Sequence, residues 1–164
     1  MTKSFFEQVQ IFHRTFLNPA PEKPTVLSLD RTVVRGSFLV EEVVEMIQQT
    51  SKNEEEFHAQ IARLKEKMTA AVEKSEKDAY NTDEKEVLIG QLDALIDQLV
   101  FVIGSLVELG VDPEQFFKIV MDANMAKLDE NGKPIFRPSD GKIMKPEGWE
   151  PPEPKLRLEL EKLL

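Results

Sequence analysis

A long apolar segment near the middle of the chain most strongly limits how this protein can fold. From Leu92 to Leu109, in "LDALIDQLVFVIGSLVEL", almost every residue is apolar, and Gly110 follows as a helix-ending residue. The apolar residues recur at helical spacing. We therefore expect a helix over 86–109 whose unbroken stripe faces a core, formed by Leu92, Leu95, Ile96, Leu99, Ile103 and Leu106.

Start and stop signals divide the rest of the chain into further helices. Three prolines within 19–24 end the first helical pattern, and Ser28 or Asp30 can cap the next one. Asp112 followed by Pro113 is a typical helix start. Besides the apolar segment, we expect helices over residues 4–17, 31–50, 51–80 and 112–128, and a short tail helix over 153–164.

The segment between residue 129 and the tail helix is rich in glycine and proline. It contains the pairs Asn131-Gly132 and Asp140-Gly141, which favour tight turns. We expect a small hairpin or ordered loop held by Ile135, Phe136, Ile143 and Trp149. The predicted fold is an all-α bundle of about five helices with a short C-terminal hairpin or loop appendage, in one domain over 1–164, with a helical core over about 1–128 and a tail over about 129–164.

Composition excludes several classes of function. The 164 residues include no cysteine and carry a formal net charge of −9. Disulfides and thiolate metal sites are therefore excluded, and an acidic chain is a poor partner for a nucleic-acid polymer. No window reaches about 18 uncharged apolar residues, and the N-terminus lacks the apolar core of a signal peptide. We expect a cytoplasmic protein with no membrane partner.

Two acidic clusters interrupt apolar helices. In "FLVEEVVEMI", Glu41, Glu42 and Glu45 share one side of a helix, and in "LDALID", Asp93 and Asp97 lie one turn apart. Either cluster can be a solvated helix face. Carboxylates beside an apolar stripe are costly unless something neutralises them, and a shared cation would do so. If the helices pack side by side, the acids converge on a pocket whose oxygen ligands suit Mg²⁺ or Mn²⁺ and not zinc.

The two clusters resemble motifs of a known superfamily. "EEVVE" matches the EExxE motif of the all-α nucleoside-triphosphate (NTP) pyrophosphohydrolases, which include the MazG-like and phosphoribosyl-ATP pyrophosphohydrolase-like proteins and the dimeric dUTPases. "DALID" resembles the second acidic motif, although many members have Glu where this chain has Ala94. "NMAK…DGK…KPEGW" resembles the tail of a MazG-like subgroup, and the resemblance extends from about residue 12 to about residue 154.

The resemblance implies a four-helix MazG-like core and an Mg²⁺-dependent reaction. An NTP or dNTP would be cleaved between its α and β phosphates to a nucleoside monophosphate and pyrophosphate. Glu42, Glu45 and Asp97 are the implied metal ligands, together with Asp93 and Glu41, and Mn²⁺ could replace Mg²⁺. Glu41 or Glu42 would accept the proton of the attacking water.

Basic residues would meet the remaining phosphate charge. The candidates are Arg35, Asn124, Lys127, Arg137, Lys142 and Lys145. The resemblance also implies a homodimer or a dimer of dimers. The alternative hypothesis is a non-catalytic all-α oligomeric interaction protein whose acids form solvated helix faces.

Overall fold

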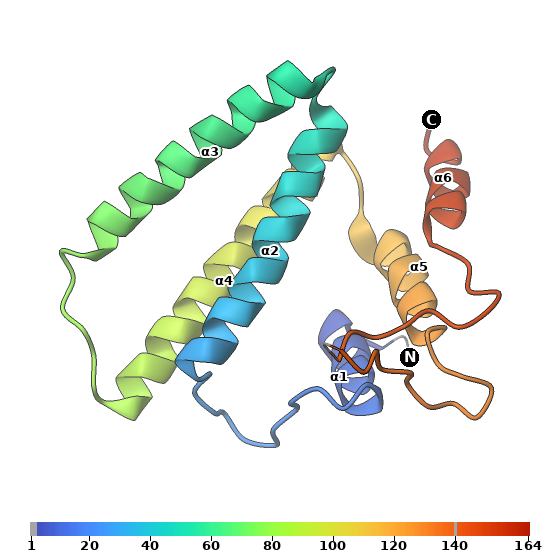
Figure 1. Ribbon diagram of the computed structural model, residues 1–164, viewed down its shortest axis with the longest axis horizontal. Coiled ribbons are helices and arrows are strands. Elements are labelled where there is room, and N and C mark those ends of the chain that lie inside the picture. The colour runs from blue at the N-terminus through green and yellow to red at the C-terminus, as the bar shows by residue number, and fades with distance from the viewer. Residues whose placement is uncertain (1–2, 140) are drawn as a thin grey trace. The chain divides into compact units, whose positions relative to one another are not determined.

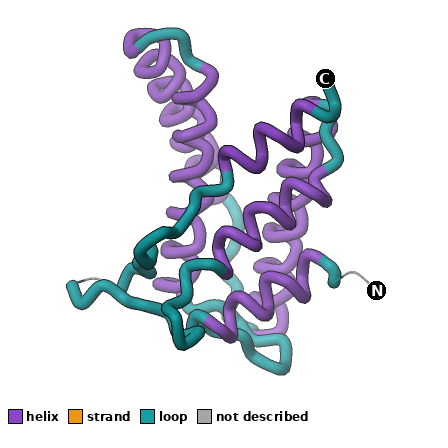
Figure 2. The backbone as a smooth tube through the Cα atoms, turned by 90° about the vertical axis from the view of Figure 1, so that its right-hand side faces the viewer, coloured by secondary structure: helices purple, strands orange, loops and turns teal. Residues whose placement is uncertain are grey.

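The computed structural model describes residues 3–139 and 141–164, which form helices and loops (Figures 1 and 2). This part of the chain contains no strand, so the all-α fold class is confirmed. Its helices are α1 (Phe5–Thr15), α2 (Leu29–Thr50), α3 (Glu54–Ser75), α4 (Glu84–Leu109), α5 (Pro113–Met125) and α6 (Glu153–Glu161). The chain divides into two compact units: a central unit, Pro24–Ile96, and a terminal unit made of the residues before Pro24 and of Asp97–Leu164.

Side-chain caps fix where the helices begin. Ser28 accepts a hydrogen bond from the backbone N–H of Arg31, so α2 starts at the first of the two predicted caps. Asp112 caps α5 and Pro113 takes its first position, as the sequence predicts. Helix α3 is shorter than predicted, because Asn53 caps it and it ends at Ser75 before a loop.

In the central unit, α2 and α3 pack as a helical hairpin (Figure 1). Gln91 of α4 is joined to Leu27, two residues before α2, by two hydrogen bonds. Its amide Oε1 accepts from the backbone N–H of Leu27 and its Nε2 donates to the Leu27 carbonyl, both at 2.9 Å. One side chain thus satisfies both polar groups of a partly buried backbone unit 64 residues away in sequence.

We expect Gln91→Ala to destabilise the protein by about 1–2 kcal/mol, because it leaves the N–H and carbonyl of Leu27 unpaired. Thermal unfolding measures this as a melting temperature lower by several degrees. Gln49→Ala is the matched control, since Gln49 bonds only its exposed neighbour Gln48. Equal melting of the Gln91 variant and the wild type would contradict the role of this clamp.

The core of the terminal unit lies where α1 meets α5. Phe16, 2% exposed, and Met121, 8% exposed, are the only buried hydrophobic side chains among the described residues. Phe5 of α1 stacks on Phe117 of α5 with ring centres 4.2 Å apart. Helix α6 packs on the other flank of α5. These contacts fix α5 and the loop that follows it.

The glycine- and proline-rich segment forms ordered turns with two isolated antiparallel bridges, Leu128↔Pro134 and Phe136↔Ile143. In the first turn, Gly132 adopts a φ of 71°, which favours glycine. The backbone N–H groups of Lys133 and Asn131 donate to Asp129, and the resulting hydrogen bonds hold the pKa of its carboxyl below the usual value. The predicted hairpin or ordered loop is therefore present as turns with isolated bridges, while Asp140 of the second predicted turn lies outside the described residues.

The apolar stripe of α4 differs from the sequence-based expectation. Leu92, Leu99 and Ile103 were expected to face a core, yet they are 58%, 53% and 36% exposed. All residues of the central unit are described, and none of them is fully buried. The reason is that α4 is apolar around its circumference, which requires more covering surface than the described residues of either unit supply.

Helix α4 also has the length and composition of a membrane span, with an 18-residue window of mean hydropathy 1.7. A core helix of a water-soluble protein meets the same criterion. Asp93 and Asp97 lie in the middle of α4, where carboxylates are expensive in a bilayer. The acids therefore favour a helix that packs against protein.

Candidate active site

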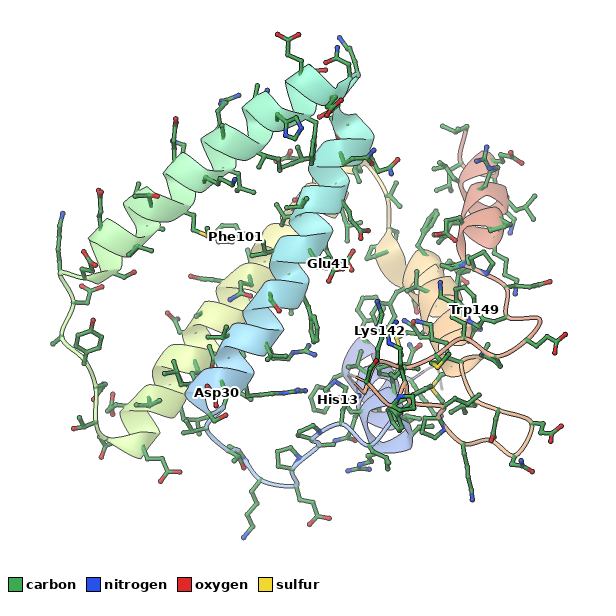
Figure 3. The ribbon with its side chains drawn as sticks, viewed as in Figure 1. His13, Asp30, Glu41, Phe101, Lys142 and Trp149 are labelled. Carbon is green, nitrogen blue, oxygen red and sulfur yellow. The ribbon has the colours of Figure 1, made fainter. Side chains whose placement is uncertain are left out.

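The first acidic motif lies on α2 of the central unit, where Figure 3 marks Glu41. Glu41, Glu42 and Glu45 are all exposed, and Glu45 is one turn from Glu41. None of the three makes a hydrogen bond or ion pair with any residue that the structure describes. Their oxygens are therefore available to an external cation.

The second acidic motif lies on α4. Asp93 and Asp97 are one helical turn apart and both exposed. The boundary between the units falls just before Asp97, so Asp93 belongs to the central unit and Asp97 to the terminal unit. Two carboxylates at this spacing repel each other, which a bound cation would relieve.

In residues 3–139 and 141–164, no three or more His, Asp or Glu side chains lie close enough together to hold a metal ion. The predicted convergence of four or five carboxylates is thus not seen in the described residues. Their chemistry still fits the predicted ion, because all five are hard oxygen donors and none has a basic partner within 3–139 and 141–164. The metal site remains a prediction.

The basic candidates of the terminal unit are better defined. Lys127, just after α5, donates from Nζ to Asn124 Oδ1 at 2.8 Å. Its Nζ also lies 5.6 Å from the centre of the Trp149 ring, and Lys145 Nζ lies 4.2 Å from the same centre. The structure therefore brings two of the predicted substrate-binding residues together over the indole of Trp149, which Figure 3 labels, and Asn124 is bonded to one of them.

Electrostatic repulsion is present in this cluster. Burial lowers the pKa of Lys127 below its ordinary value, and the ammonium groups of Lys145 and Lys142 lower it further. A bound anion would stabilise the charged form of Lys127, because it would offset both the burial and the repulsion. The positive charge of this cluster is of the sign that phosphate groups would require.

Three further basic candidates are Lys142, whose ammonium is near enough to lower the pKa of Lys127, and the arginines Arg137 and Arg35. Arg137 and Lys142 face each other across the second turn, where the Arg137 N–H donates to the Lys142 carbonyl at 2.8 Å. Arg35 belongs to α2, with its guanidinium carbon 5.7 Å from the centre of the Phe38 ring. The sequence predicts Trp149 as an anchor of the tail and does not point to a place for it beside the substrate-binding candidates. Its position four residues after Lys145 was the available signal.

Comparison with known proteins supports one class. A model of the family described as phosphoribosyl-ATP pyrophosphohydrolase matches residues 9–124. A crystal structure from Exiguobacterium sp. 255-15, of a protein inferred to be an NTP pyrophosphohydrolase, is 48% identical to this chain. That match has a TM-score of 0.95 and covers 99% of this chain and 97% of the other. A comparison with curated proteins finds no significant match.

The all-α fold and the two acidic motifs, taken with these matches, define a pyrophosphohydrolase. The chain belongs to the phosphoribosyl-ATP pyrophosphohydrolase family, within the MazG-like superfamily that its motifs resemble. The predicted enzyme class is thereby confirmed. The alternative of a non-catalytic interaction protein is not retained.

Proposed function

We propose that this enzyme hydrolyses a nucleoside or deoxynucleoside triphosphate between its α and β phosphates, in a reaction that depends on Mg²⁺. The observation that carries the proposal is the pair of exposed acidic motifs on α2 and α4 of a pyrophosphohydrolase, which have no basic partner among the residues that the structure describes. We choose an NTP over phosphoribosyl-ATP because the NTP pyrophosphohydrolase structure matches nearly the whole chain, whereas the family model stops at Asn124.

The acidic residues have distinct proposed roles. Glu42, Glu45 and Asp97 would hold Mg²⁺, with Glu41 and Asp93 as further ligands, and Mn²⁺ could take its place. When bound, the ion neutralises phosphate charge and makes a bound water more acidic. Glu41 or Glu42 takes a proton from the attacking water. The water oxygen bonds to phosphorus, the P–O bond of the α–β bridge breaks, and the products are a nucleoside monophosphate and pyrophosphate.

The basic residues of the terminal unit act on the other end of the substrate. Lys127, Lys142 and Lys145 meet the negative charge that grows on the departing pyrophosphate, and Asn124 orients Lys127 by its hydrogen bond. Arg137 is a further proposed contact of the tail. Arg35, on the same helix as the first acidic motif, is proposed to contact phosphate near the metal.

We also propose that the active enzyme is a homodimer or a dimer of dimers in which a second copy covers the apolar surface of α4. Many apolar side chains of α4 are exposed. In the terminal unit, the end of α4 forms part of the lining of a groove of about 870 Å³. Apolar residues of three helices line it, among them Leu106, Phe116 and Leu156. A contiguous apolar surface of this kind is typical of an interface between subunits.

The test is a panel of NTPs, dNTPs and phosphoribosyl-ATP, incubated with the enzyme and Mg²⁺ or Mn²⁺ and assayed separately for pyrophosphate and orthophosphate. We expect pyrophosphate and the matching monophosphate from at least one nucleoside triphosphate, and no product in EDTA. Orthophosphate alone, or turnover of phosphoribosyl-ATP only, would overturn the proposal.

A further inference from the structure

We propose that Trp149 is a positioning residue whose indole ring holds the ammonium groups of Lys127 and Lys145 together as a receptor for the pyrophosphate portion of the substrate. This inference rests on the proposed function, because it assigns the leaving group of that reaction to a defined place. It depends only on residues of the terminal unit.

The ring itself is fixed by a hydrogen bond to the end of α5. Trp149 Nε1 donates to the carbonyl oxygen of Ala123 at 2.8 Å. In a continuing helix that carbonyl would accept from the N–H of Lys127, but this N–H bonds to the Asn124 carbonyl instead, at 3.2 Å. The indole therefore caps α5 at the turn from which Lys127 extends.

The fixed ring then gathers the cations. An ammonium group within about 6 Å of an indole centre is attracted to the negative face of the ring. Lys145 Nζ, at 4.2 Å, and Lys127 Nζ, at 5.6 Å, both satisfy this condition. Lys145 reaches the ring because the turn at Gly148, with a φ of 76°, brings the segment 145–149 back on itself.

Two lysines held on one ring repel each other, and the structure offers them little compensation. Neither Lys127 nor Lys145 forms an ion pair with a residue of the described part of the chain. Lys127 is also half-buried, which makes its charge more costly. The ligand that relieves such a pair is an anion with several closely spaced negative charges, and pyrophosphate has this chemistry.

The experiment uses the complete chain and inorganic pyrophosphate as the probe, in titration calorimetry. We expect Trp149→Leu to weaken pyrophosphate binding about ten-fold, because both cation–π contacts are lost. Trp149→Phe keeps an aromatic face but not the N–H, so its binding should stay within about three-fold of the wild type. A purely structural role would instead make affinity follow the melting temperature of the two variants.

Fluorescence gives an independent readout, because Trp149 is the only tryptophan. Pyrophosphate should change its emission as the ammonium groups turn toward the anion. Lys145→Met should reduce both the change and the affinity, even if Trp149→Leu fails to fold. Lys155→Met is the control. Lys155 is an exposed lysine of the same unit, and its Nζ lies 3.8 Å from Glu150 Oε2.

Unchanged pyrophosphate affinity in both Lys145→Met and Trp149→Leu would overturn the inference, as would an absence of pyrophosphate binding by the wild type. The proposed function can fail separately. If the enzyme binds pyrophosphate through this cluster but cleaves no NTP, the pyrophosphate receptor is supported and the proposed reaction is wrong.

Discussion

Glu45→Gln and Asp97→Asn are each expected to lower kcat for pyrophosphate release about a thousand-fold, with little change in stability. Each replaces a carboxylate by a neutral amide of the same shape, which binds Mg²⁺ poorly. Loss of the several kcal/mol that a metal ion contributes to the transition state corresponds to this factor. Because both side chains are exposed and unpaired in the described structure, the folded state should change by no more than about 0.5 kcal/mol.

Turnover and the melting temperature in Mn²⁺ together show whether Glu45 and Asp97 bind the metal ion or only affect the substrate by their charge. Mn²⁺ should raise the melting temperature of the wild type, and this shift should disappear in both variants even without nucleotide. Glu108→Gln is the control, because Glu108 is an exposed acid of the same helix outside the motif. If both variants keep full turnover and full stabilisation by Mn²⁺, the metal-site assignment is wrong.

Phe101→Glu is expected to dissociate the proposed oligomer, with Kd raised at least about a hundred-fold. Phe101 lies on α4 and is 71% exposed (Figure 3). Burial of a phenylalanine in an interface contributes about 2 kcal/mol, and burial of an unpaired carboxylate in its place is strongly unfavourable. Sedimentation velocity over a range of concentrations should show the variant as monomer where the wild type is dimer or tetramer.

Tyr80→Glu is the matched control for an exposed aromatic residue outside the α4 surface, since Tyr80 is 92% exposed in the loop before α4. It should leave the sedimentation of the protein unchanged. If the wild type sediments as a monomer, or if the Phe101→Glu variant sediments as the same oligomer as the wild type, a second copy does not cover this part of α4.

Local signals were sufficient for much of the fold. The Ser28 and Asp112 caps, Pro113 and the left-handed Gly110, whose φ is 69°, mark ends that depend on nearby backbone hydrogen bonds. Such signals act within one turn, so they can be read without tertiary information. The length of α3 was overestimated, because charged residues of good helix propensity continue beyond Ser75 although the helix ends there.

Residue type and spacing along a helix were enough to predict the helical class, the two acidic motifs and the enzyme family. The sequence also named Lys127 and Lys145 as basic candidates. Only the tertiary structure placed them on the face of Trp149, because that arrangement needs a turn at Gly148 and a hydrogen bond between residues 26 positions apart. Contacts of that range depend on how the chain folds back, which local propensity does not specify.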